Sequence, residues 1–239
     1  MRNREISLTP EQAGELAAPV MAAVLATSPK RAQYWIGKKR KLVAELLKVL
    51  EGNGAGDTSD IAGLPTGWQA FYRDLFGLEL DFSGLRIPEK QEGFDRLLVV
   101  AEGMTPNKLY DKCVELFPCW RYTKNLDFIT SDRDPKNGAY VLWVKDGQEA
   151  DEELKNSSAN DLKKKNVTTE TLPERLLHEL KYFKETGKHL DIHNWTFCVG
   201  SRDPSGYVPY VGWDGDSFRV GWCDPDGRND NFRGRAAVS

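Results

Sequence analysis

Two histidines in the C-terminal half have a spacing that could bind a metal ion. His189 and His193 are four residues apart with Asp191 between them, and on a helix this spacing would put both imidazoles on one face. The pair follows Gly187, which is expected to end the preceding helix, and it brings no third strong ligand. A structural role is therefore favoured, and an enzyme or metal-binding protein that uses His189 and His193 stays as an alternative.

Other residues with chemical potential are not arranged in a known catalytic or metal-binding pattern. The acid-rich stretch DPDGRND at residues 224–230 lacks the alternating oxygen donors and the closing Glu of a calcium loop, which favours a solvated turn. Neither a glycine-rich phosphate loop nor a G-x-S-x-G motif is present. No C-x-x-C spacing joins the four cysteines, which are Cys113, Cys119, Cys198 and Cys223. We therefore expect no catalytic residue, no metal and no cofactor.

The composition narrows the class of protein. The chain has 239 residues, a net charge of −3 and a pI near 5.8, which argues against a nucleic-acid-binding protein that works through bulk charge. The apolar run at residues 16–26 follows several glutamates and contains Pro19, so it predicts neither a signal peptide nor a membrane span. A cytoplasmic protein is expected.

The C-terminal 39 residues have an unusual alphabet. From Ser201 onward there is no Lys, Glu, Gln, Met or His, although the first 200 residues contain 18 Lys, 17 Glu and 5 Gln. Random change of only the adenines in an Asn codon yields Asn, Asp, Tyr, Ser, Gly, Arg, Cys and others, but never Lys, Glu, Gln, Met or Trp. Two interpretations stay open. Either the codons of the tail were diversified by such a process, or a short Gly- and Asp-rich region lacks these residues by chance.

The elements that must position these residues begin with a helical N-terminal segment at residues 1–52. Thr9, Pro10 and Gln12 form a capping box, and helices are expected at residues 9–28 and 31–51. Residues 53–66 read as a linker. A third interpretation is that the protein is a structural or assembly module, in which these helices would associate to form a homo-oligomer.

Residues 67–239 alternate between helical and strand patterns, which predicts an α+β domain. Aromatic residues recur on one helical face in TGWQAFYRDLFG, and Gly77 can close that helix. Residues 148–171 are polar and are predicted to be a long surface excursion. Helices are also expected at residues 105–117 and 172–187, and strands at residues 78–82, 94–103, 138–147 and 194–201.

A hairpin is predicted near the C-terminal end, where VPYVGW and FRVGWC flank the turn DGDS. Alternation along its strands puts apolar residues on one face, namely Val211, Trp213, Phe218, Val220 and Trp222. The opposite face then carries small or hydrogen-bonding residues, which the fold does not require to be of one type.

The segment TLPERLLHELKYFKETGKHLDIHNWTFCVGSRDPSGYVPYVGW, with RVGW and FRGRAAVS after it, resembles the C-terminal part of a large set of bacterial hypothetical proteins. Their ending is similar to the variable proteins of diversity-generating retroelements, in which adenine-specific errors of a reverse transcriptase diversify the 3′ end of a gene. The stretch GWQAFYRDLFGLELDFSGLRIP also resembles a module of these proteins, so the resemblance covers about residues 67–239.

This resemblance implies a C-type-lectin-like fold, related to that of formylglycine-generating enzymes, with a variable region at about residues 201–235 that binds an unknown protein or other macromolecular ligand. The acid-rich motif of calcium-dependent lectins and the catalytic cysteines of the enzymes are not recognisable, so sugar, calcium and oxidase activity are not implied. Tyr207 and Tyr210 would be the energetic anchors. The implied variable positions are Asp203, Tyr207, Tyr210, Gly212, Asp214, Ser217, Arg219, Gly221, Cys223, Gly227, Asn229, Asp230, Asn231 and Gly234.

Overall fold

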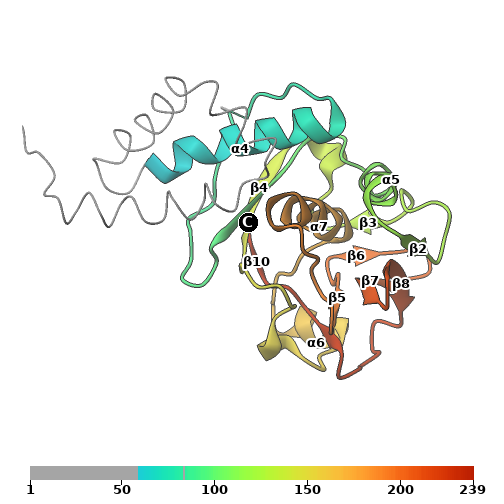
Figure 1. Ribbon diagram of the computed structural model, residues 1–239. Coiled ribbons are helices and arrows are strands. Elements are labelled where there is room, and N and C mark those ends of the chain that lie inside the picture. Colours follow the sequence, from blue (N-terminus) through green and yellow to red (C-terminus); the bar gives the residue numbers. More distant parts are fainter. Residues whose placement is uncertain (1–58, 83) are drawn as a thin grey trace, which may run out of the picture. The chain divides into compact units, whose positions relative to one another are not determined.

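The computed structural model describes residues 59–82 and 84–239, with side chains from residue 67 onward (Figure 1). The chain divides into two units, Met1–Ile61 and Ala62–Ser239. The two helices predicted at residues 9–28 and 31–51 lie outside the described residues. The first described helix, α4 (Ser59–Phe76), begins earlier than expected, so residues 59–66 are helical rather than a linker.

Local signals at the helix ends explain where the main helices begin and end. The side chain of Thr105 accepts a hydrogen bond from the backbone of Lys108 and caps α5 (Pro106–Leu116). At α7 (Leu172–Thr186), the Glu174 carboxylate accepts a hydrogen bond from the backbone N–H of Thr171 at 2.7 Å. Gly187 then adopts the left-handed conformation, with φ of 69°, and closes the helix as predicted.

Three sheets complete the mixed α+β domain. A three-stranded antiparallel sheet has the order β1 (Arg96–Val100), β4 (Tyr140–Val144), β10 (Ala237–Val238). A two-stranded sheet pairs β3 (Thr130–Ser131) with β6 (Ser201–Arg202). A five-stranded sheet has the order β2 (Cys119–Arg121), β8 (Ser217–Cys223), β7 (Val208–Asp214), β5 (Trp195–Phe197), β9 (Phe232–Arg233).

The hydrophobic core gathers around α7. Figure 1 shows this helix between the three-stranded and the five-stranded sheets, and it packs against α5, β1 and β7. Every residue from Leu172 to Leu180 is buried, so this half of α7 has no solvent-facing side. Its polar side chains must therefore find partners inside the protein.

Two sequence-based expectations for this domain were wrong. Residues 78–82 form no strand; Phe82 is buried there in irregular backbone, packing against Tyr72. Residues 148–171 are not simply a surface excursion, because they contain two short helices, η2 (Glu152–Leu154) and α6 (Ala159–Lys164), and carry buried residues. The polar composition of this segment reflects internal hydrogen bonding as well as exposure.

A further short helix, η1 (Pro135–Asn137), lies between β3 and β4.

Within the part of the chain that the structure describes, no helix combines the length and the apolar character needed to cross a membrane.

Candidate binding surface

The predicted hairpin is present, and its two faces differ as expected. Strands β7 and β8 pair antiparallel from Val208 opposite Cys223 to Asp214 opposite Ser217, and Gly215 takes a φ of 63° in the turn. The face toward α7, called the core face, is fully apolar at its centre, where Val211, Phe218 and Val220 are buried. We call the opposite face of the whole five-stranded sheet the outer face.

Strand register places a row of large side chains across the outer face. The row crosses all five strands. Trp120 in β2 is opposite Arg219 in β8, and Arg219 is opposite Gly212 in β7. Gly212 is opposite Trp195 in β5, and Trp195 is opposite Phe232 in β9. The adjacent row contains Gly221, Tyr210 and Phe197. The outer face is therefore aromatic at its rim and carries glycine at two positions near its middle.

Neighbouring aromatic rings leave little room for a side chain at these two glycines. A Cβ atom on Gly221 would lie 2.4 Å from Cζ of Tyr210, and one on Gly212 would lie 2.8 Å from the backbone oxygen of Asn194. Tyr210 in turn packs edge-on against Trp195, with ring centroids 5.2 Å apart. A side chain at Gly221 would require the Tyr210 ring to move, and one at Gly212 would meet backbone as well as the Trp195 ring. Whether these two positions vary stays a prediction.

One end of the outer face is covered rather than open. Val208 and Phe197 are fully buried and pack with Ala159 and Leu162 of α6 in a second, smaller core. Tyr210 and Cys223 pack against its margin and are half-buried. The interpretation of this whole face as exposed surface was therefore wrong at this end, where α6 shields it from solvent.

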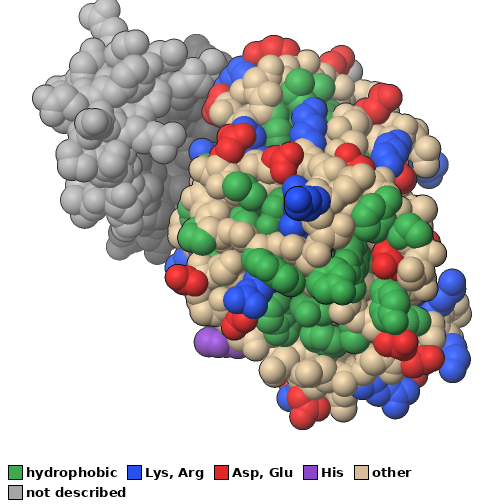
Figure 2. Space-filling view, turned by 90° about the vertical axis from the view of Figure 1, so that its right-hand side faces the viewer, with side chains coloured by type: hydrophobic (Ala, Val, Ile, Leu, Met, Phe, Trp, Pro, Cys, Tyr) green, Lys and Arg blue, Asp and Glu red, His purple; other side chains and the backbone are tan. Residues whose placement is uncertain are grey.

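The other end of the outer face is open and aromatic. The Trp120 side chain is 47% exposed and that of Tyr122 is 70% exposed, with ring centroids 6.5 Å apart. The Arg219 guanidinium lies 5.7 Å from the Trp120 ring and 2.9 Å from the carboxylate of Asp214. Figure 2 shows hydrophobic side chains gathered on the α5 and β2 side of the molecule, with acidic and basic groups around them. Aromatic rings beside an arginine are the chemistry that dominates many protein interfaces.

Several predicted positions in the loops have a local structural role. The Asp203 carboxylate accepts hydrogen bonds from the backbone N–H groups of Ser205 and Tyr207 at 2.9 and 2.8 Å, and the Asn229 side chain accepts one from Asn231 at 2.8 Å. The tyrosine that the first turn presents, Tyr207, is 44% exposed. Asp203 and Asn229 therefore shape the loops, and Tyr207 is the side chain offered to solvent.

The remaining predicted positions divide by exposure. Gly234 is buried, and a Cβ there would lie 3.0 Å from Leu154. Gly227 has no room for a side chain either, since a Cβ would lie 2.5 Å from Sγ of Cys223. Asp230 and Asn231 are exposed, and Ser217 is half-buried. The accessible part of the predicted set is thus Tyr207, Asp214, Arg219, Asn229, Asp230 and Asn231.

Asp191 belongs to a buried ionic cluster and not to a metal site. Its carboxylate accepts a hydrogen bond from Nε of Arg175 at 2.9 Å, one from Nη2 of Arg235 at 2.7 Å and one from the Thr196 hydroxyl at 2.5 Å. Burial alone would raise the pKa of Asp191, but Arg235 and Arg175 overcome that effect and hold the pKa below its usual value. This carboxylate is therefore ionised and fully used inside the protein.

The two histidines of the alternative interpretation do not form a ligand set with Asp191. Nδ1 of His189 lies 2.8 Å from the Glu179 carboxylate, and its ring packs against Trp213, whereas His193 is exposed. Among residues 67–82 and 84–239, no group of three His, Cys, Asp or Glu side chains is placed to hold a metal ion.

A second buried pair, Glu170 and His178, gives the domain a predicted pH response. Nδ1 of His178 lies 2.7 Å from the Glu170 carboxyl, and both side chains are fully buried. Burial raises the pKa of Glu170 from 4.5 to about 7, and burial lowers the pKa of His178 well below 6.5. Between pH 4.5 and 7 the folded protein thus keeps a proton on Glu170 that the unfolded chain has lost.

Replacing Glu170 by Gln should change the dependence of stability on pH. A raised carboxyl pKa makes the free energy of unfolding fall as pH rises through this window, while the lowered pKa of His178 acts in the opposite sense below pH 6.5. Gln keeps a polar partner for His178 and removes only the first contribution. Relative to the wild type, the variant should gain stability between pH 5 and pH 8 in urea titrations. Parallel pH profiles for the two proteins would contradict the raised pKa.

In comparisons with protein-family models, with curated proteins and with solved structures, nothing matched this chain.

Proposed function

We propose that this chain is a non-enzymatic recognition protein that binds a macromolecular ligand on the open end of the outer face. The observation that carries the proposal is the exposed pair Trp120 and Tyr122 beside Arg219. Trp, Tyr and Arg supply most of the binding energy in known interfaces, and two rigid rings already held on a sheet lose little entropy on binding.

The C-type-lectin-like scaffold and its diversification by a retroelement belong to the same proposal. What supports them is how the restricted alphabet of residues 201–239 is distributed between the two faces of the hairpin. Tryptophan, which an adenine-altered Asn codon cannot encode, occurs in this region only at Trp213 and Trp222, both predicted framework positions that pack against the core. The accessible predicted positions are Tyr, Asp, Arg and Asn, which such codons do encode.

Diversification can be tested in the DNA. We expect codons derived from AAC or AAT at Tyr207, Asp214, Arg219 and Asn229, and a near-repeat of the tail's coding sequence that differs only at adenines. A neighbouring reverse-transcriptase gene is expected as well. Tyr, Asp and Asn have only codons that end in C or T, so Arg219 is the discriminating position. A codon there that ends in A or G cannot arise from AAC or AAT by changes of adenine, and it would contradict the diversification.

Ligand binding can be tested with the double substitution Trp120→Ala and Tyr122→Ala. Both rings are exposed, so we expect little change in melting temperature, but a loss of binding of about 2 kcal/mol or more, roughly thirtyfold in Kd. The immobilised chain would be used to isolate a ligand from cell extract, and Kd would be measured with the purified ligand by surface plasmon resonance.

Ile192→Ala is the matched control for this experiment, because Ile192 is also an exposed apolar residue but lies before β5, outside the strands of the sheet. Tyr207→Ala tests the predicted anchor in the loop before β7. Tyr210 is less suited to this purpose, because it supports the packing over Gly221. Equal affinity of the wild type and the Trp120/Tyr122 variant for the ligand would show that the open end of the outer face is not the binding surface.

A further inference from the structure

A polar cavity of about 500 Å³ lies between α6, the strand pair β3–β6 and the segment before α7. Its volume is within the range of small-molecule sites in proteins. None of the residues that line it is on the outer face, so this cavity is distinct from the proposed recognition surface. Its polar lining contains three cationic side chains, Lys163, Arg133 and Arg202, and one carboxylate side chain, Asp132. Hydroxyl and amide groups complete the lining, and Ser239 is among them.

Arg202 is a cation held in place by backbone hydrogen bonds, and it has no ion-pair partner among the described residues. Its Nη1 donates hydrogen bonds to the carbonyl oxygens of Val199 at 2.6 Å and Ser201 at 2.7 Å, which hold the guanidinium in place. Among the described residues, no carboxylate lies within ion-pair distance, and Nε and Nη2 donate to no protein acceptor. Burial lowers the pKa of Arg202, with Asp132 opposing that effect, as expected of a charge that is only partly compensated.

The other two cations differ in how far they are neutralised. Arg133 donates from Nε and Nη2 to the buried Glu174 carboxylate at 2.7 and 2.6 Å, so its charge is already balanced. Lys163 lies in the last turn of α6 and has no ion pair with any described residue. The cavity thus offers two cationic side chains, Arg202 and Lys163, neither of which has an ion pair with a described residue. Arginine with free N–H donors is well suited to phosphate oxygens.

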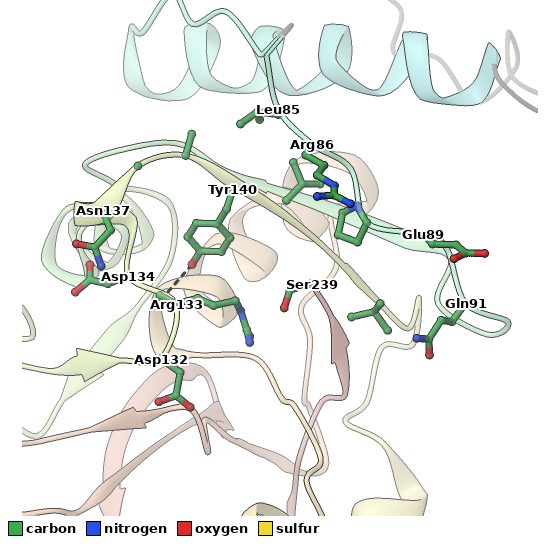
Figure 3. A pocket seen from close by; sticks show the side chains of 15 residues that line it. Leu85, Arg86, Glu89, Gln91, Asp132, Arg133, Asp134, Asn137, Tyr140 and Ser239 are labelled. Atoms are coloured by element: carbon green, nitrogen blue, oxygen red, sulfur yellow. Dashed lines mark hydrogen bonds between the residues drawn. The ribbon is translucent and has the colours of Figure 1, made fainter.

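Asp132 argues against a simple inorganic anion as the preferred ligand. Its backbone N–H donates a hydrogen bond to the Gly200 carbonyl at 2.8 Å, and Asp132 lines the same cavity. Asp132 and Arg133 also line a neighbouring cavity of about 810 Å³; Figure 3 shows Tyr140 and Arg133 on its wall, with the Asp132 side chain turned away from its centre. A carboxylate beside hydroxyl and amide groups accepts hydrogen bonds from ligand hydroxyls.

We propose that this cavity binds a phosphorylated sugar or polyol, with Arg202 and Lys163 holding the phosphate and Asp132 accepting hydrogen bonds from hydroxyls of the carbon skeleton.

The test is isothermal titration of the full-length protein with glucose 6-phosphate, inorganic phosphate and glucose. We expect glucose 6-phosphate to bind with a Kd of about 1 mM or tighter, inorganic phosphate more weakly and glucose not measurably. Arg202→Gln should weaken binding of glucose 6-phosphate about tenfold or more, and added salt should weaken it in the wild type.

Lys163→Gln and Lys164→Gln form a matched pair on the same helix. Both lysines are exposed in the last turn of α6, but only Lys163 lines the cavity. Lys163→Gln should weaken binding and Lys164→Gln should not, a comparison that stays decisive if Arg202→Gln fails to fold. Absence of glucose 6-phosphate binding at about 10 mM, or equal losses in the two lysine variants, would overturn the site. Equal affinity for glucose 6-phosphate and inorganic phosphate would overturn the role of Asp132.

Discussion

Replacing Asp191 by Asn should lower the free energy of unfolding by about 3–5 kcal/mol, the usual cost of removing one partner from a buried ion pair. Asp191 lies between Arg175 and Arg235, and the substitution leaves both guanidinium groups buried without a countercharge on that side. Its backbone has a φ of 54°, a left-handed conformation that Asn tolerates well. The substitution therefore tests the charge with little added backbone strain, and urea denaturation at pH 7 measures the loss.

Asp74→Asn is the control for this experiment. Asp74 also pairs with an arginine, Arg73, but both side chains are more than half exposed. Removal of its charge should change the free energy of unfolding by no more than about 0.5 kcal/mol. The interpretation of Asp191 as the centre of the buried cluster fails if the two variants lose similar amounts of stability.

Adding a methyl group at Gly212 should destabilise the domain by about 1–3 kcal/mol. The new Cβ would lie 2.8 Å from the backbone oxygen of Asn194 and 2.9 Å from the Trp195 ring, and the backbone oxygen cannot move without disturbing the pairing of β5 with β7. Thermal denaturation of Gly212→Ala measures this effect. A variant as stable as the wild type would show that the outer face accepts side chains at this position.

Gly221→Ala makes a sharper comparison, because its obstacle is a side chain. In the wild type the new methyl group meets the Tyr210 ring, whereas in a Tyr210→Ala background that ring is gone. A double-mutant cycle should therefore show that Gly221→Ala costs less in the second background, with a coupling energy of about 0.5–3 kcal/mol. Additive effects would mean that Tyr210 moves aside freely and that the two positions vary independently.

The elements with local signals could be predicted from the sequence. Helix α7 begins at Thr171, whose backbone N–H bonds to Glu174 three residues later, and it ends at a glycine. The β7–β8 hairpin closes at an Asp-Gly pair, so a few neighbouring residues determine each boundary. The period-two alternation of the hairpin correctly separated buried Val211, Phe218 and Val220 from the opposite face. Whether the domain has a C-type-lectin-like fold stays a prediction.

The composition of the outer face could not be predicted, because it depends on pairing between distant segments. Strand β2 lies parallel to β8, about a hundred residues later in the chain, and brings Trp120 beside Arg219. The only local trace of this arrangement is the alternation of Trp120 and Tyr122 in CWRY after Pro118. The cover that α6 provides at the other end was hidden by the polar sequence around it.

The partners of Asp191 could not be predicted from the sequence for a similar reason. The spacing of His189, Asp191 and His193 suggested ligands for a metal, but the strongest partners of Asp191 are Arg175 and Arg235, one on each side of it in the sequence. A sequence pattern shows neighbours along the chain, whereas a buried carboxylate is neutralised by whichever cation the tertiary fold brings to it.

The position of Arg235 affects how the domain is completed during synthesis. Its guanidinium donates to the carbonyl oxygens of Gly147 at 2.9 Å and Gln148 at 2.7 Å as well as to Asp191, and β10 follows it immediately to pair with β4. While translation has not reached this arginine, Asp191 lacks Arg235 as a partner, and β1 is the one described strand that can pair with β4. A nascent chain therefore cannot form these contacts until residues 235–238 have left the ribosome, so this part of the core closes only after the rest of the domain has been synthesised.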